Sequence, residues 1–269
     1  MPVLQMMPNK NPTILALDFD GVLCNGLREY FETAWRTYCQ IWQPADTAPP
    51  ENLAPIFYRL RPVIETGWEM PVLIRALLQG RGEEEILQQW QAIAQQIITA
   101  EGRDPKEIAE KLDKTRDNWI STNLEEWLSL HEFYPGVIER LQRTISSPTK
   151  PVIITTKEGR FVRQLLEQQG IELPPDSIIG KESKRPKHQT LRELLAASGE
   201  GTSIWFIEDR MKTLLSVKQQ SDLWNVKLFL ADWGYNTEAE RSFVAENVPI
   251  QLLSLSQFSQ SFSAWYGLV

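Results

Sequence analysis

The chain has 269 residues, enough for one large domain or for a core domain that carries a smaller one. Hydrophobic residues make up 42% of it and charged residues 23%, ordinary values for a globular protein that buries a core. With 28 basic and 35 acidic side chains the net charge is −7, which argues against a nucleic acid or an anionic membrane as partner.

Nothing in the sequence indicates a membrane span or a secretory signal. No apolar run approaches the roughly 18 residues of a transmembrane helix, and residues 1–12 lack the apolar core of a signal peptide. Cys24 and Cys39 are too few for a disulfide framework, so we expect reduced thiols. These features predict a soluble, cytoplasmic protein and leave its oligomeric state open.

The first predicted strand stops at acidic residues. Residues 13–17 form a short apolar run that ends at Asp18, Phe19, Asp20 and Gly21. A short run of this kind is typical of a buried parallel strand, followed here by a loop.

The stretch from residue 26 to about residue 133 has a helical pattern and no convincing strand. Asp104 and Pro105 are typical of an N-cap and of a first helical position. Residues 44–55, rich in Pro and Ala, indicate a loop. The predicted helices are residues 27–43, residues 83–99 and a helix from Asp104 toward Trp119.

From residue 134 onward, predicted strands and helices alternate, which indicates right-handed βαβ units on a parallel sheet. The predicted strands are residues 152–155, 177–179, 203–207 and 226–230, and the predicted helices are residues 159–169, 187–197 and 211–219. The predicted fold class is therefore α/β. A Rossmann-like parallel-sheet core is expected from residues 1–25 and 134–269, with residues 26–133 inserted as a helical domain.

Polar side chains follow three of the predicted strands. Asp18 and Asp20 come after the first, Thr155 ends the second, and Glu208 and Asp209 follow a third. Because the carboxyl ends of parallel strands share one crevice, we expect these side chains to converge there. Carboxylate oxygens suit a hard cation such as Mg²⁺.

The order of these motifs resembles that of the haloacid dehalogenase-like (HAD) superfamily. The family's motifs are D-x-D-G-[TV] after an apolar strand, a Thr or Ser at a strand end, a Lys near a helix start, and an acidic pair at a strand end. They are matched by Asp18 to Val22, by Thr155, by Lys187 or Lys184, and by Glu208 with Asp209. The resemblance covers about residues 13–25 and 134–235, and the insert falls where the family has its helical C1 cap.

Two assignments within this resemblance are open. Lys187 is favoured as the motif lysine because it begins a predicted helix and Leu191 follows four residues later. Lys184 fits less well, since Arg185 stands where the family's variant has proline. Either acid of the 208–209 pair could contact the metal directly, and Asp209 is favoured.

The resemblance implies an Mg²⁺-dependent phosphohydrolase. Asp18 would attack phosphorus to form an aspartyl phosphate, while Asp20 would protonate the leaving alkoxide and then activate water. Mg²⁺ would be bound by Asp18, the main-chain carbonyl of Asp20 and Asp209; Lys187 and Thr155 would hold the phosphoryl oxygens. Dehalogenases of the superfamily lack the second Asp, so its presence favours phosphoryl transfer.

Other residues carry weaker signals. Lys157 is a candidate for phosphate contact or, equally, a solvated charge. The motif Trp233-Gly234-Tyr235 resembles a turn of phosphoglycolate phosphatase-like members, although a structural aromatic turn would look the same.

A helical cap that closes over the site favours a small phosphorylated metabolite as substrate. Within the insert, residues 58–62 and 65–69 look loop-like, so Arg59, Arg61 and Glu65 are candidates for reading the substrate; ordinary packing is the alternative. A phosphomutase, or a non-catalytic regulatory protein on the same scaffold, are the competing functions.

Overall fold

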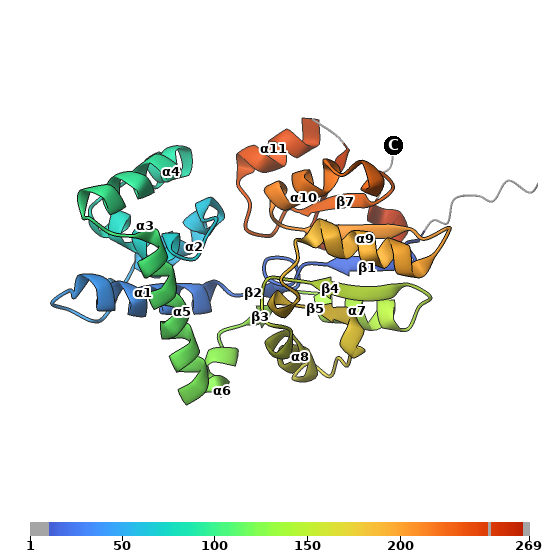
Figure 1. The fold of residues 1–269 in the computed structure, drawn as a ribbon, viewed down its shortest axis with the longest axis horizontal. Helices are drawn as coiled ribbons and strands as arrows, with labels where there is room; N and C mark the ends of the chain where they lie inside the picture. Colours follow the sequence, from blue (N-terminus) through green and yellow to red (C-terminus); the bar gives the residue numbers. More distant parts are fainter. Residues whose placement is uncertain (1–10, 247–248, 266–269) are drawn as a thin grey trace, which may run out of the picture. The chain divides into compact units, whose positions relative to one another are not determined.

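A computed structural model describes residues 11–246 and 249–265 (Figure 1). The chain divides into two compact units. The first comprises Met1–Asn25 and Phe133–Val269, and the second is the continuous segment Gly26–Glu132. No helix in the described ranges is both long enough and apolar enough to cross a membrane.

The first unit is built on a six-stranded sheet of order β5-β4-β1-β6-β7-β8, in which every neighbouring pair is parallel. This confirms the predicted α/β fold class. The strands are β1 (Ile14–Leu17), β4 (Lys150–Ile154), β5 (Ile178–Ile179), β6 (Ile204–Glu208), β7 (Lys227–Ala231) and β8 (Ile250–Leu253).

Helices follow most of these strands, as Figure 1 shows. They are α7 (Val137–Ile145), α8 (Gly159–Glu167), α9 (Lys187–Ser198), α10 (Met211–Lys218), α11 (Glu238–Glu246) and α12 (Leu255–Phe258), with short 3-10 turns η2 (Pro175–Ser177), η3 (Lys181–Ser183), η4 (Ser221–Leu223) and η5 (Phe262–Trp265).

Both faces of this sheet are buried, which explains why its strands are continuous apolar runs rather than alternating ones. Ile14 and Ala16 of β1 point into a core shared with α9, α10 and α11. On β6, Trp205 belongs instead to an aromatic cluster with Phe229, Phe262 and Trp265. Leu15 and Leu17, which alternate with them along β1, are also fully buried, so this central strand is buried on both faces.

The second unit is helical. Its elements are α1 (Leu27–Trp42), α2 (Leu53–Leu60), η1 (Arg61–Val63), α3 (Glu69–Leu78), α4 (Glu83–Ala100), α5 (Pro105–Thr122) and α6 (Leu124–Leu128). Two short strands, β2 (Cys24–Asn25) and β3 (Glu132–Phe133), pair with each other at the two ends of the segment.

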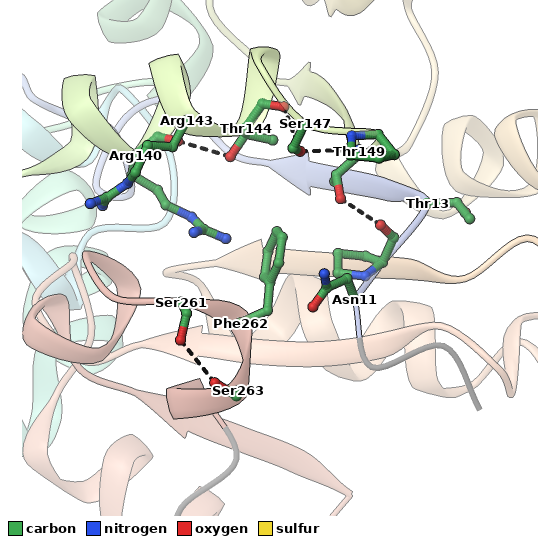
Figure 2. A pocket seen from close by; sticks show the side chains of 12 residues that line it. Asn11, Thr13, Arg140, Arg143, Thr144, Ser147, Thr149, Ser261, Phe262 and Ser263 are labelled. Carbon is green, nitrogen blue, oxygen red and sulfur yellow. Dashed lines mark hydrogen bonds between the residues drawn. The ribbon is translucent and has the colours of Figure 1, made fainter. Parts of the chain in front are cut away.

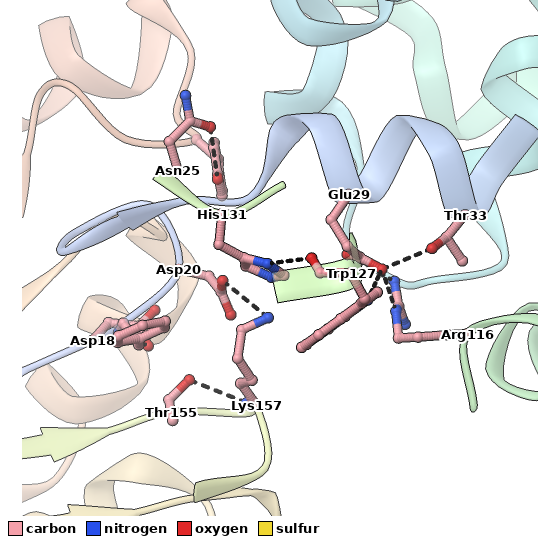
Figure 3. Close-up of polar contacts among 12 residues, drawn as sticks. Asp18, Asp20, Asn25, Glu29, Thr33, Arg116, Trp127, His131, Thr155 and Lys157 are labelled. Atoms are coloured by element: carbon pink, nitrogen blue, oxygen red, sulfur yellow. Dashed lines mark hydrogen bonds and ion pairs between the residues drawn. The ribbon is translucent and has the colours of Figure 1, made fainter. Parts of the chain in front are cut away.

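A buried carboxylate ties three helices of this unit together (Figure 3). Glu29 of α1 is fully buried and accepts hydrogen bonds from Arg116 Nε at 2.7 Å, Thr33 Oγ1 at 2.7 Å and Trp127 Nε1 at 3.1 Å. Burying a charge is costly unless it is paired and hydrogen-bonded, and both conditions are met here. Glu29 is therefore a structural residue of the helical unit.

The predicted helices at residues 27–43 and 83–99 are confirmed within one residue at each end. Asp104 caps α5 as expected, since its Oδ1 accepts the Lys106 N–H at 2.9 Å. The predicted loop at residues 44–55 was too long. Helix α2 already begins at Leu53, because Leu53, Phe57 and Leu60 form a buried stripe at helical spacing that outweighs the nearby prolines.

Candidate active site

The carboxyl ends of three adjacent strands bring the predicted side chains together. Asp18 follows β1, Thr155 follows β4 and Glu208 is the last residue of β6. Because β1 lies between β4 and β6 in parallel register, these residues share the edge of the sheet where α/β proteins bind ligands. All three are buried, with at most 7% of each exposed.

A lysine lies between two of these acids. Lys187, the first residue of α9, places its Nζ 2.7 Å from Asp18 Oδ1 and 2.8 Å from Glu208 Oε2. Burial acts to lower the pKa of Lys187, but the two carboxylates outweigh it and raise the pKa above its ordinary value. Lys184, in contrast, is exposed at the end of η3. The structure thus brings Lys187, and not Lys184, to the acids.

Asp18, Glu208 and Asp209 form a compact acidic cluster. Each offers one carboxylate oxygen, and these oxygens lie within 4.8 Å of one another. Burial, together with the negative charge of Glu208, raises the pKa of Asp18 to about 8. Burial and the charge of Asp18 raise the pKa of Asp209 to about 6. The single lysine does not neutralise the cluster, so a bound cation would be stabilised there.

Asp209 is held by main-chain and amide groups from the turn after β7. Its Oδ2 accepts the Tyr235 N–H at 2.7 Å, and its main-chain carbonyl accepts Asn236 Nδ2 at 3.0 Å. Its Oδ1 is buried without a hydrogen-bond partner in the described part of the chain. The Asp209 side chain does not cap α10, whose N-cap is Arg210.

Two glycines make room for Asp209. A Cβ on Gly21, at φ +87°, would lie 2.2 Å from Asp209 Oδ2. A Cβ on Gly234 would lie 2.3 Å from the Asp209 Cβ. Position 21 of the D-x-D-G motif therefore requires glycine for two reasons: its φ is positive, and a side chain there would collide with Asp209.

The acidic cluster meets the requirements of an oxygen-ligated divalent cation. Among the described residues, no group donates a hydrogen bond to the buried Asp209 Oδ1, and a carboxylate oxygen of Asp18 lies within 4.8 Å of one of Asp209. Glu208 fits direct coordination less well, because its Oε2 is engaged by Lys187 and its Oε1 accepts the Arg210 N–H at 3.0 Å. A hard cation of the Mg²⁺ type suits such a set of carboxylate oxygens.

Asp20 has a different partner from the other acids (Figure 3). Its Oδ1 lies 3.3 Å from Lys157 Nζ, and the Lys157 side chain is only 9% exposed. The Lys157 main-chain N–H also donates to Thr155 Oγ1 at 3.1 Å. The alternative of a solvated charge is therefore wrong for Lys157. Arg160, by comparison, forms an exposed pair with Glu158.

The candidates in the helical unit occupy mixed positions. Arg59 makes two hydrogen bonds to Glu83 at 2.9 and 2.6 Å, and both side chains are exposed. Arg61 Nη1 donates to the Ile64 carbonyl at 3.1 Å. Glu65 is exposed in the stretch between η1 and α3. The loop-like prediction for residues 58–62 was wrong, since these residues end α2 and form η1, where Phe57 and Leu60 anchor the helix in the core.

The turn after β7 makes more contacts with the candidate site than the sequence indicated. Trp233 Nε1 donates to the Val22 carbonyl at 3.1 Å, and the next three residues enclose Asp209. Sequence reasoning missed Asn236. Ligands bind at the carboxyl ends of parallel strands, and the same rule applied to β7 could have identified this residue. The aromatic pattern of the turn gave no hint of these main-chain contacts.

Solved structures share this architecture, although no family model and no curated protein matches the sequence. A HAD-like family hydrolase from Streptococcus pneumoniae has 13% identity and a TM-score of 0.55, over 90% of this chain and 94% of its own. A predicted phosphatase from Clostridium acetobutylicum has 13% identity and a TM-score of 0.56, over 91% and 95%. The protein tyrosine kinase A of Mycobacterium tuberculosis has 14% identity and a TM-score of 0.53, over 91% and 94%.

Identities this low establish the fold alone. The likeness nevertheless extends over at least 90% of this chain in each of the three structures, so it is not limited to the parallel sheet. The resemblance inferred from the four motifs is thereby confirmed at the level of architecture. The chain has the fold of the haloacid dehalogenase-like phosphatases.

Proposed function

We propose that this protein is an Mg²⁺-dependent phosphohydrolase that acts on a small phosphorylated metabolite through an aspartyl phosphate on Asp18. One observation carries the proposal. The Asp18 carboxylate follows the central strand β1, 2.7 Å from the Lys187 ammonium and within 4.8 Å of a carboxylate oxygen of Asp209, whose Oδ1 has no hydrogen-bond partner among the described residues. A candidate nucleophile (Asp18), a lysine that could bind phosphate (Lys187) and a candidate metal ligand (Asp209) thus lie close together.

Asp18, Asp209 and the main-chain carbonyl of Asp20 are the groups that would hold the cation. When bound, Mg²⁺ supplies positive charge that keeps Asp18 ionised and lowers its repulsion from the phosphoryl oxygens. Glu208 is assigned a positioning role, since it pairs with Lys187 and accepts from the Arg210 main chain.

The remaining steps belong to side chains of the core. Asp18 attacks phosphorus, and the leaving alkoxide takes a proton from Asp20. Lys187 and the Thr155 hydroxyl hold the phosphoryl oxygens as negative charge builds. Asp20 then removes a proton from the water that cleaves the acyl phosphate, which returns Asp18 as a carboxylate. Lys157, 3.3 Å from Asp20, orients that carboxylate between the two steps.

The test is a phosphatase assay with p-nitrophenyl phosphate and a panel of phosphorylated metabolites. We expect free phosphate to be released with Mg²⁺, activity to disappear in EDTA, and Mg²⁺ to restore it. Asp18→Asn is the matched variant, because the amide is nearly isosteric but is no nucleophile. It should fold normally and retain less than about a hundredth of wild-type activity, in line with loss of a nucleophile.

Two other functions would give different results. A phosphomutase would transfer phosphate between positions of a sugar and depend on a bisphosphate activator, with little phosphate released. A non-catalytic scaffold would show no turnover on any substrate of the panel, with or without Mg²⁺. Full activity after thorough chelation would remove the metal role of Asp18 and Asp209.

A further inference from the structure

A pocket lies at the amino-terminal end of the strands of the same sheet (Figure 2). It has a volume of about 640 Å³ and is lined by residues before β1, on α7, before β4 and around η5. These segments precede or face the amino ends of β1 and β4, whereas Asp18 and Thr155 follow their carboxyl ends. Twelve of the described residues line it; none of these twelve is acidic, and two of them, Arg140 and Arg143, are basic.

Arg140 is the feature that sets this pocket apart. Only 5% of the residue is exposed, and it forms no ion pair with any described residue. Its Nη1 donates to the Gln260 carbonyl at 3.1 Å. Its Nε and Nη2 are buried without a hydrogen-bond partner among residues 11–246 and 249–265. Buried arginines are normally paired, so this one is an exception that calls for an explanation.

The two unpartnered nitrogens are the ones that an oxyanion would use. The N–H groups of Nε and Nη2 lie on one edge of the guanidinium and point in the same direction. This fork is the edge that binds two oxygens of a carboxylate or phosphate side by side. The arrangement is therefore complementary to a planar or tetrahedral anion.

Aromatic packing accounts for the faces of this guanidinium but not for its edge. The Arg140 Cζ lies 3.9 Å from the centre of the Phe262 ring and 5.1 Å from that of Trp265. Such contacts stabilise a cation through the ring faces. They provide no hydrogen-bond acceptor for the in-plane N–H groups of Nε and Nη2, and Figure 2 shows the guanidinium of Arg140 beside Phe262 on the pocket side of α7.

The surroundings add positive charge and a hydroxyl donor. Arg143 lies one turn along α7 and also lines the pocket. Burial and the charge of Arg143 lower the pKa of Arg140 to about 10, so it remains charged at neutral pH. The hydroxyls of Ser261 and Ser263 bond to each other at 2.8 Å, and only one proton is needed for that bond. The other hydroxyl can donate to a ligand.

We propose that this pocket binds a small oxyanion, a phosphate or a carboxylate group, on the Nε–Nη2 edge of Arg140. The site is separate from the catalytic residues and does not depend on the proposed phosphatase activity. Its ligand would be held by the Arg140 fork, with Arg143 and the Ser261–Ser263 pair as secondary contacts.

Calorimetric titration of the full chain with sulfate in EDTA tests this site. Sulfate mimics phosphate but is not hydrolysed, and succinate in a parallel titration distinguishes a preference for carboxylates. We expect saturable binding by the wild-type protein, at least tenfold weaker binding by Arg140→Met, and an intermediate value for Arg140→Lys. Arg160→Met removes a charge elsewhere on the same unit and should bind like the wild type.

Two further variants decide the remaining outcomes. Lys187→Ala should leave sulfate binding unchanged; if it abolishes binding while Arg140→Met does not, sulfate occupies the catalytic site and the proposal is wrong. If circular dichroism shows that Arg140→Met is unfolded, Arg143→Met replaces it and should weaken binding at least threefold. No saturable binding of either anion at millimolar concentration would also overturn the proposal.

Discussion

Asp18, Glu208 and Asp209 are three buried carboxylates, and a single lysine, Lys187, pairs with the first two of them. Without a cation, Asp18 and Asp209 have pKa values of about 8 and about 6, against an ordinary 3.8. At these two carboxyls the folded chain therefore binds more protons than the unfolded chain between about pH 4 and pH 8. In this window the free energy of unfolding falls as pH rises. Lys187, with its raised pKa, stays protonated throughout.

We predict that the melting temperature in EDTA decreases from pH 5 to pH 8, and that Mg²⁺ stabilises the protein more at pH 8 than at pH 5. Other groups titrate too, so the informative comparison is with Asp18→Asn, which lacks the most strongly shifted carboxyl. Its melting temperature in EDTA should change less over the same range. Parallel pH profiles for the two proteins would contradict the charge assignment.

The two lysines of the third motif give a second prediction at this scale. Lys187→Ala should lower kcat/KM by roughly 10²-fold or more, the usual cost of losing a group that stabilises transition-state charge. Lys184→Ala should leave it within about twofold, because Lys184 is exposed at the end of η3, whereas Lys187 contacts Asp18 and Glu208. Steady-state kinetics on p-nitrophenyl phosphate measure both, and the reverse ranking would transfer the role to Lys184.

At the scale of the elements, the loop after β1 and the turn after β7 both pack against the Asp209 side chain. Gly21 and Gly234 both approach it too closely for a Cβ. We predict that Gly21→Ala loses activity and Mg²⁺ affinity. Its control is Gly170→Ala, which has a similar φ of +69° but nothing within 4 Å of the added Cβ. Both variants carry backbone strain of about 1–2 kcal/mol, so equal kinetic losses would show that strain alone is responsible.

The elements also show how far the sequence could predict the structure. Buried strands such as β1 and β6 were predictable because an apolar run ending in polar residues has few other interpretations. The paired strands β2 and β3 were not predictable, since a strand of two residues shows no periodicity. Strand β8 was also missed: it has only four residues, and its burial does not alternate from one residue to the next.

The candidate site was also predictable only in part. Asp18, Thr155 and Glu208 were predictable because strand topology alone brings strand ends together. The pairing of Lys157 with Asp20 was not, because it depends on the path of a loop side chain. Arg140 could not be predicted for a related reason. Among the described residues, its Nε and Nη2 have no hydrogen-bond partner, and a local sequence pattern does not show whether a side chain will lack partners in the fold.

At the scale of the whole molecule, the helical unit is one uninterrupted segment whose two ends are marked by the paired strands β2 and β3. Within this segment, the Glu29 cluster joins α1, α5 and α6. We propose that this segment serves as a cap that selects the leaving group, while the sheet unit carries the chemistry.

This division of labour predicts that substitutions in the cap change substrate preference rather than basal chemistry. Arg59→Ala, Arg61→Ala and Glu65→Ala should raise KM for the best metabolite several-fold. Hydrolysis of p-nitrophenyl phosphate, which needs little recognition, should remain within about twofold, since none of the three belongs to the proposed catalytic set. Arg59 pairs with Glu83 at the surface, where an ion pair contributes little to stability, so its loss should not unfold the cap.

Arg81→Ala is the matched control for these three variants. Arg81 is another arginine of the helical unit that pairs at the surface, with Glu85 and Gln96, and it lies outside the candidate segment. It should leave KM for both substrates unchanged. If the three variants lower both activities equally, they act through folding. If none of them alters either activity, specificity resides in other residues, and the proposal that this segment reads the substrate is wrong.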